Sequence, residues 1–237
     1  MTTQIGILAL TAASVGFLHT LTGPDHYLPF IVMGKARNWE TFKTLWLTVL
    51  CGIGHVGSSV VLGLIGVLMG VGIQHLKWFE TSRGNIAAWA FLIFGIAYLA
   101  YGLVKAYRSR PHTHQHLHED GSEHLHEHTH FDAHTHVHKL EGKANITPWI
   151  LFVVFVLGPC EPLIPFFMLP AAQNSYWGLL LVVLAFSIVT IATMTSIVYL
   201  GLKGFHFISI KFAERYFHAI AGGTIALCGI AILVLGL

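Results

Sequence analysis

Charged side chains are scarce in this sequence. Lys, Arg, Asp and Glu make up 10% of the 237 residues, whereas a soluble globular protein has about 25%. So few charges cannot cover the surface of a soluble protein of this size. A formal net charge of +2 gives neither the basic surface of a nucleic-acid-binding protein nor the charge excess of a disordered chain. With 54% apolar residues and a mean hydropathy of +0.67, the chain is expected in a lipid bilayer.

Cysteine is also scarce. Cys51, Cys160 and Cys228 lie far apart in apolar runs, which excludes a disulfide framework and a CxxC metal site. The sequence has no HExxH motif and no evident pair of nucleophile and base, so we do not expect an enzyme. The N-terminus carries no basic residue before its short first apolar run, and we therefore expect no cleaved signal peptide.

Long apolar runs dominate instead. A membrane-crossing helix needs about 20 mostly apolar residues, and the sequence has six such runs, the first and fourth of them followed or interrupted by a Gly-Pro pair. They cover approximately residues 4–21, 44–71, 86–107, 148–169, 176–202 and 217–237. The alternation of a β-barrel is absent. The predicted fold is an all-α polytopic membrane protein with six transmembrane helices.

Lys and Arg are distributed unevenly over the two faces that six spans define. One face would hold Lys77 and Arg83, and the other would hold the remaining 11 of the 13 basic residues. The positive-inside rule then predicts both termini outside and the polar segment 108–146 in the cytoplasm of a plasma (inner) membrane.

The two halves of the chain resemble each other. Gly23–Phe30 reads against Gly158–Phe166, and Gly95–Leu103 reads against Gly229–Leu237 in the same order. Each half holds three spans, so the second would be inverted, and inverted repeats with broken helices are typical of transporters. We expect a first repeat at 1–107, a histidine-rich loop at 108–146 and a second repeat at 147–237.

The predicted membrane interior holds few ionisable residues, and they gather at the Gly-Pro breaks. They are His19, Asp25, His26, His55 and Glu161. Such residues are functional candidates because burying them in lipid is costly. A histidine in a span can also be a hydrogen-bonded packing residue, and Glu161 can lie near the interface. Imidazole and carboxylate together suit a borderline divalent metal ion, so these five residues form our candidate metal site.

Eleven of the 17 histidines lie in the polar segment. Flexible histidine tracts bind divalent metals with modest selectivity, and the alternatives are a plain solvated linker or a pH sensor. The candidate loop ligands are His112, His114, His116, His118, His124, His126, His128, His130, His134, His136 and His138.

Three short motifs resemble the nickel/cobalt transporter superfamily, in its urease-accessory-type and nickel/cobalt-efflux branches. His19 through Asp25-His26 resembles the H-A-x-D-A-D-H signature with one extra residue, Gly54-His55 with Ser58–Val61 resembles L-G-H-S-T-V-V, and Gly158 with Glu161 loosely resembles L-G-F-D-T-A-S-E. The resemblance implies that His19, Asp25, His26 and His55 form a metal path. The resemblance slightly favours efflux as the direction of transport, and import stays open.

Gly158-Pro159-Cys160 also resembles the Pro-Cys motif of membrane thiol-disulfide carriers of the cytochrome c biogenesis type. Such a carrier needs a cysteine pair, whereas the residue that corresponds to Cys160 in the first half is Asp25. We therefore favour a secondary transporter of Ni²⁺ or Co²⁺, with Zn²⁺ as a further candidate, and keep the thiol carrier as the alternative. The expected partners are the bilayer, the ion and a cytoplasmic metallochaperone, without nucleic acid and without a permanently bound cofactor.

Overall fold

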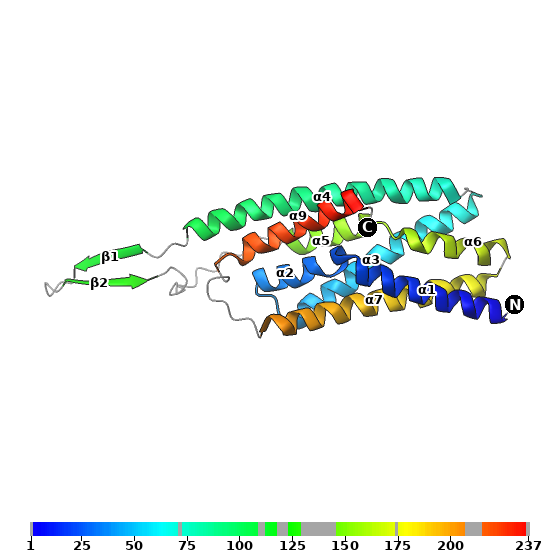
Figure 1. Ribbon diagram of the computed structural model, residues 1–237, viewed down its shortest axis with the longest axis horizontal. Coiled ribbons are helices and arrows are strands. Elements are labelled where there is room, and N and C mark those ends of the chain that lie inside the picture. The colour runs from blue at the N-terminus through cyan, green and yellow to red at the C-terminus, as the bar shows by residue number, and fades with distance from the viewer. Residues whose placement is uncertain are drawn as a thin grey trace.

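The computed structural model describes residues 2–70, 73–108, 112–117, 123–128, 146–173, 175–206 and 215–235. This part of the chain is an elongated helical bundle with a two-stranded hairpin beyond one end (Figure 1). The elements in chain order are α1 Thr2–Thr22, η1 Pro24–His26, α2 Leu28–Ala36, α3 Thr41–Leu68, α4 Ile73–Arg108, β1 His112–Leu117, β2 Glu123–His128, α5 Ile146–Leu157, η3 Glu161–Leu163, α6 Ile164–Ala172, α7 Tyr176–His206 and α9 Phe217–Leu235.

Six helical segments are long and apolar enough to cross a membrane, which confirms the predicted all-α polytopic fold. They are Thr3–Thr22, Thr41–Leu68, Gln74–Arg108, Ile146–Phe166, Tyr176–Gly204 and Phe217–Leu235. Large apolar side chains face outward, and Leu68, Tyr176 and Trp177 are more than 80% exposed. Lipid satisfies such a surface, whereas water does not. The protein is therefore a multi-pass membrane protein. Which end of the bundle lies in the cytoplasm stays a prediction of the charge count.

Both Gly-Pro pairs interrupt a helix in the same way. Proline lacks an amide hydrogen and clashes with the preceding turn, so α1 ends before Pro24 and α5 ends before Pro159. A short 3₁₀ helix follows each time, η1 after the first break and η3 after the second, and a nine-residue helix then continues the chain as α2 or α6. The similarity of the two breaks agrees with two related halves of the chain, but the inverted repeat itself stays a prediction.

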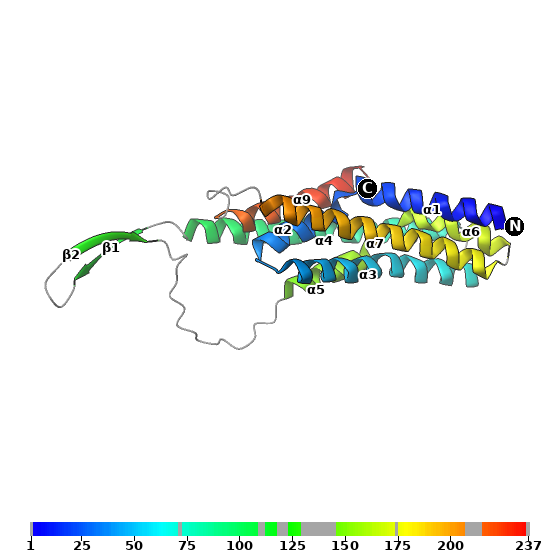
Figure 2. The same cartoon turned by 90° about the horizontal axis from the view of Figure 1, so that it is seen from below.

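The closest helix packing joins α4 and α9, which lie side by side in both views (Figures 1 and 2). A Cβ on Gly95 or Gly102 would overlap the backbone of α9, and a Cβ on Gly222 would overlap the backbone of α4. Small residues allow this approach in membrane helices. Gly54 of α3 also lies close to a neighbouring helix, since a Cβ there would be 2.7 Å from Val156 of α5, whereas Gly57 of α3 has no neighbour within 4 Å of such a Cβ.

The histidine-rich segment differs from the irregular chain that we expected. Residues 112–117 and 123–128 form an antiparallel pair in which His112, His114 and His116 lie opposite His128, His126 and His124. The other five histidines of the tract, His118, His130, His134, His136 and His138, lie outside the described residues.

Candidate functional site

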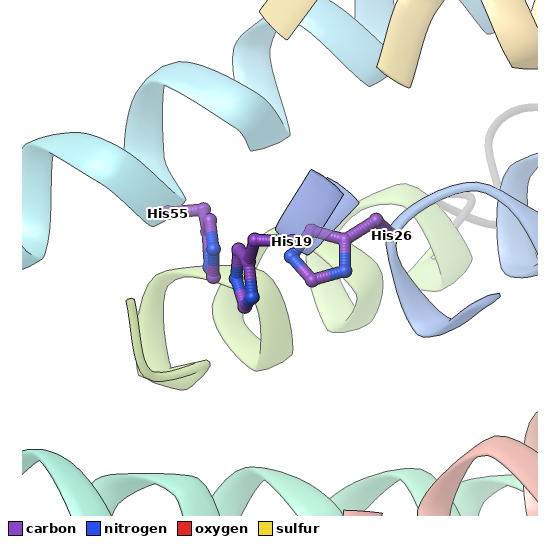
Figure 3. A group of neighbouring side chains, drawn as sticks. All are labelled: His19, His26 and His55. Atoms are coloured by element: carbon purple, nitrogen blue, oxygen red, sulfur yellow. The ribbon is translucent and has the colours of Figure 1, made fainter. Parts of the chain in front are cut away.

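Three of the predicted metal ligands meet inside the bundle. His19 comes from the last turn of α1, His26 from η1 and His55 from α3 (Figure 3). One ring nitrogen from each histidine lies within 4.8 Å of the others. The ring of His26 stands edge-on to both neighbours, with centroids 4.7 Å from His19 and 5.0 Å from His55. In the described part of the chain, this histidine cluster is the group that can hold a metal ion.

The local hydrogen bonds orient two of the rings. His26 Nδ1 lies 3.1 Å from the carbonyl of Gly23, and His55 Nδ1 lies 3.3 Å from the carbonyl of Phe155. A carbonyl only accepts hydrogen bonds, so Nδ1 of both rings carries the hydrogen and donates it. The lone pair of each neutral ring is then on Nε2.

All three Nε2 atoms of the histidine cluster are buried and without a hydrogen-bond partner. His26 and His55 are each 3% exposed. Leaving a buried polar atom unpaired costs about 1–3 kcal/mol, so three such atoms pointing into one place form an expensive arrangement. Buried unpaired groups of this kind are typical of sites that take up a ligand.

The first break makes room for the cluster. Gly23 lies against His26, and a Cβ there would come within 2.5 Å of His26 Nδ1. Gly158 of the second break has the same relation to His55, with a corresponding distance of 3.2 Å. Both Gly-Pro pairs therefore do two things at once: proline opens the helix and glycine admits an imidazole.

The two carboxylates of the predicted site lie in different surroundings. Asp25 joins the histidine cluster from the side, with its Oδ1 3.4 Å from His26 Nδ1. Glu161 does not join it, because its Oε1 accepts a 2.7 Å hydrogen bond from Thr81 of α4. Among the remaining histidines in described helices, His75 is exposed and His218 bonds to Tyr98, so neither belongs to the cluster.

Two cavities adjoin the histidine cluster. A small one of about 20 Å³ is lined by all three histidines and Asp25. A larger one of about 250 Å³ is lined by residues of both breaks and of α4, among them Gly23, Pro159 and Glu161. His19, Pro159 and Ile232 line both cavities, so the two spaces share part of their walls.

A buried ion pair between Glu80 and Arg83 of α4 went unpredicted. Arg83 Nη1 lies 2.6 Å from Glu80 Oε1, and the Glu80 side chain is fully buried. We had assigned this stretch to a loop because its polar residues interrupt the apolar run, whereas α4 begins at Ile73 and places both residues inside the bundle. The signal was their spacing, since residues three apart lie on one helix face.

This ion pair holds the second break in place. Glu80 Oε2 accepts hydrogen bonds from the backbone amide of Cys160 and from Ser59. Arg83 Nη2 donates to the carbonyl of Val156 in the last turn of α5 and to that of Gly158 just beyond it. The Glu80–Arg83 pair thus satisfies the backbone that carries Cys160.

All three cysteines are buried and free. Cys160 stands directly before η3 and is 0% exposed, packed with Leu163 and Phe186. Cys51 packs in a different apolar cluster of the bundle, with Met194 and Phe155. The structure therefore brings one cysteine to a proline break and pairs it with no other.

The comparisons with known proteins give one match. Residues 28–231 match the model of a family described as the cytochrome C biogenesis protein transmembrane region. No curated protein and no solved structure shows significant similarity to the chain.

This match overturns the predicted membership of the nickel/cobalt transporter superfamily, and with it the predicted function as a nickel or cobalt transporter. The motifs behind that prediction were short and imperfect, and a bundle that turns a few polar residues inward at helix breaks produces such motifs in more than one family. The comparisons lend no support to the metal cargo or to the metallochaperone expected with it. The Pro-Cys resemblance at Gly158-Pro159-Cys160 pointed to the right family.

Proposed function

Because this chain belongs to the cytochrome c biogenesis transmembrane family, we propose that it is a membrane thiol-disulfide carrier that works through one cysteine, Cys160. The observation that carries the proposal is the place of this residue. Cys160 follows Pro159 at the second break, where an interrupted helix exposes its backbone to two side chains of α4. Neither of the other cysteines lies at a break.

A single cysteine exchanges disulfides without a resolving partner in its own chain. The thiolate of Cys160 attacks one sulfur of a disulfide on a partner molecule. A bond forms between Cys160 and that sulfur, the partner's disulfide breaks, and its second sulfur leaves as a thiolate. A thiolate of the electron donor then attacks the mixed disulfide at the sulfur of Cys160, and the partner leaves with both of its sulfurs as thiolates. A second donor thiolate attacks the donor's sulfur in the new mixed disulfide, which forms the donor's disulfide and releases Cys160 as a thiolate. Two electrons pass from the two donor thiols to the partner's disulfide.

Transfer across the bilayer requires Cys160 to meet reactants from both faces in turn. Cys160 is fully buried, but its neighbours Pro159, Glu161 and Pro162 line the cavity of about 250 Å³. Movement at the break would expose the thiol to that space. Proline-broken helices supply such movement in membrane carriers because their backbone is held by side chains rather than by a continuous helix.

Reconstituted liposomes test the proposal. Vesicles that contain the full chain are loaded with glutathione and suspended in the impermeant disulfide 5,5′-dithiobis(2-nitrobenzoate). We expect release of thionitrobenzoate beyond one equivalent per chain, at a rate at least tenfold above that of protein-free vesicles. Cys160→Ser should return the rate to that of protein-free vesicles.

Cys51→Ser and Cys228→Ser are the matched controls, because both residues are also buried free cysteines. Each should keep the rate of the unaltered chain. An unaltered chain that does not exceed protein-free vesicles, or a Cys160→Ser variant as fast as the unaltered chain, contradicts the proposal. If Cys51→Ser abolishes the rate as well, a pair of cysteines carries the electrons and the single-cysteine mechanism is wrong.

A further inference from the structure

We propose that the histidine cluster at the first break binds one transition-metal ion as a resident group, through the Nε2 atoms of His19, His26 and His55. This site goes beyond the thiol exchange proposed above, and Cys160 is not among the residues that line its small cavity. It does not depend on that exchange, since the three imidazoles belong to α1, η1 and α3.

The donor atoms are prepared for a metal. His26 and His55 direct their Nδ1 hydrogens to backbone carbonyls, which fixes the tautomer and leaves Nε2 as the donor. This pairing of a ligating imidazole with a second hydrogen-bond acceptor is the usual arrangement around protein-bound metals. The Nε2 atoms of all three histidines are buried without partners.

The size of the site suits one ion. One ring nitrogen from each histidine lies within 4.8 Å of the others, and metal–nitrogen bonds of about 2.0–2.1 Å require only a modest inward movement of the rings. The cavity that these residues line measures about 20 Å³. His19 also lines the larger cavity of about 250 Å³, so this space adjoins the cluster.

The donor set selects a class of ion. Three neutral imidazoles favour zinc, copper, nickel and cobalt over magnesium or calcium, which prefer oxygen ligands. Asp25 contributes one negative charge next to His26, at 3.4 Å from its Nδ1. The carboxylate lowers the cost of a buried cation and orients the His26 ring from the side opposite the ion.

A buried water molecule is the competing occupant. Water offers two hydrogens, which serve the lone pairs of His26 and His55. The oxygen of the water could accept a hydrogen bond from His19 only if that ring carried its hydrogen on Nε2. A cation accepts all three lone pairs together, and a binding measurement distinguishes the two occupants.

The histidines of the loop would also bind metal ions, so the experiment has to remove them. We take as parent the full chain in which the eleven histidines between His112 and His138 are replaced by Asn, purified in detergent and stripped with a chelator. Equilibrium dialysis against Zn²⁺ should give one tightly bound ion per chain. Replacing Zn²⁺ by Co²⁺ should give visible absorption bands of a low-coordinate site, and X-ray absorption at the zinc edge should show three imidazole ligands.

Single variants locate the ion. His55→Gln and His26→Gln should each weaken Zn²⁺ binding by more than about 100-fold, and Asp25→Asn by about 10- to 100-fold. His75→Gln is the matched control, because this histidine is exposed on α4, and it should leave the affinity unchanged. Cys160→Ser should also leave it unchanged, so a failed thiol carrier can still be a metal-binding protein.

Absence of a saturable ion in the parent overturns the proposal and indicates water in the cavity. Equal affinity in the parent and in His55→Gln also overturns it, because the ion then binds elsewhere. If a His→Gln variant fails to fold, the ligand count from X-ray absorption on the parent decides: fewer than three imidazoles contradicts the site.

Discussion

At the first break the chain runs from α1 into η1 and turns two histidines and a carboxylate inward, whereas at the second break it runs from α5 into η3 and turns a cysteine inward. The backbone is interrupted in the same way each time. The difference lies in what satisfies the freed polar groups. At the second break Arg83, Glu80 and His55 bond to the interrupted backbone, whereas the three Nε2 atoms of the histidine cluster remain unpaired.

The comparison shows that the same interruption of a helix can carry two different sets of side chains. A break in a membrane helix must be covered by protein or by water. At the second break, charged side chains of α4 bond to the interrupted backbone. At the first break, the imidazoles keep Nε2 lone pairs that have no partner. We infer that the second break is structurally complete and that the first is complete only with an occupant.

Glu80→Gln should have the largest effect on stability. The variant removes the negative partner of Arg83, whose side chain is only 19% exposed, and this loss costs up to about 3–5 kcal/mol. The free energy of unfolding, measured by SDS titration in mixed micelles, should fall by that amount. The exposed Glu40→Gln is the control and should change little.

A double variant sharpens the same measurement. Glu80→Gln combined with Arg83→Met removes both charges, so it should recover a substantial part of the lost free energy. A loss below about 1 kcal/mol for Glu80→Gln alone would contradict the view that this ion pair holds the second break.

Gly23→Ala should have an intermediate effect. Its Cβ would come within 2.5 Å of His26 Nδ1, a crowding that costs about 1–3 kcal/mol. Gly158→Ala approaches His55 only to 3.2 Å and should cost less. Thermal unfolding in detergent measures both variants.

Gly57→Ala is the control for crowding, because it is a helix glycine with no neighbour within 4 Å of the added Cβ. It should be neutral or stabilising by up to about 1 kcal/mol. If Gly158→Ala is more harmful than Gly23→Ala, the closer approach to the imidazole does not control stability at the breaks.

Thr81→Val should have the smallest effect. It removes the hydroxyl that donates to Glu161, a bond near the larger cavity that contributes about 0.5–1.5 kcal/mol. Unfolding should become easier by at most this amount, and Zn²⁺ binding by the histidine cluster should not change. A loss of Zn²⁺ binding in this variant would place Glu161 at the ion after all.

The sequence predicted the helical bundle and the helix breaks because both depend on local properties of the chain. Twenty apolar residues cross a bilayer whatever surrounds them, and Gly-Pro interrupts a helix wherever it stands. His19, His26 and His55 were also predicted together, since imidazoles within apolar runs are rare. The family was misassigned because short motifs around those histidines outweighed the single Pro-Cys motif.

Three features required the tertiary structure. Glu80 and Arg83 looked like loop residues until α4 placed them against the second break. The hydrogen bond between Thr81 and Glu161 joins residues 80 positions apart and needed the fold to be seen. The histidine cluster became a site only when the Nε2 atoms were seen to lack partners.

The chain by itself determined how many helices can cross the membrane, where two of them break and which histidines lie inside, because solvation in lipid acts on each segment separately. Only the tertiary structure decided which polar groups satisfy one another. Hydrogen bonds and ion pairs join residues such as Arg83 and Gly158, which are 75 positions apart, and no local pattern records that pairing. For that reason the two breaks look alike in the sequence and differ in the folded protein.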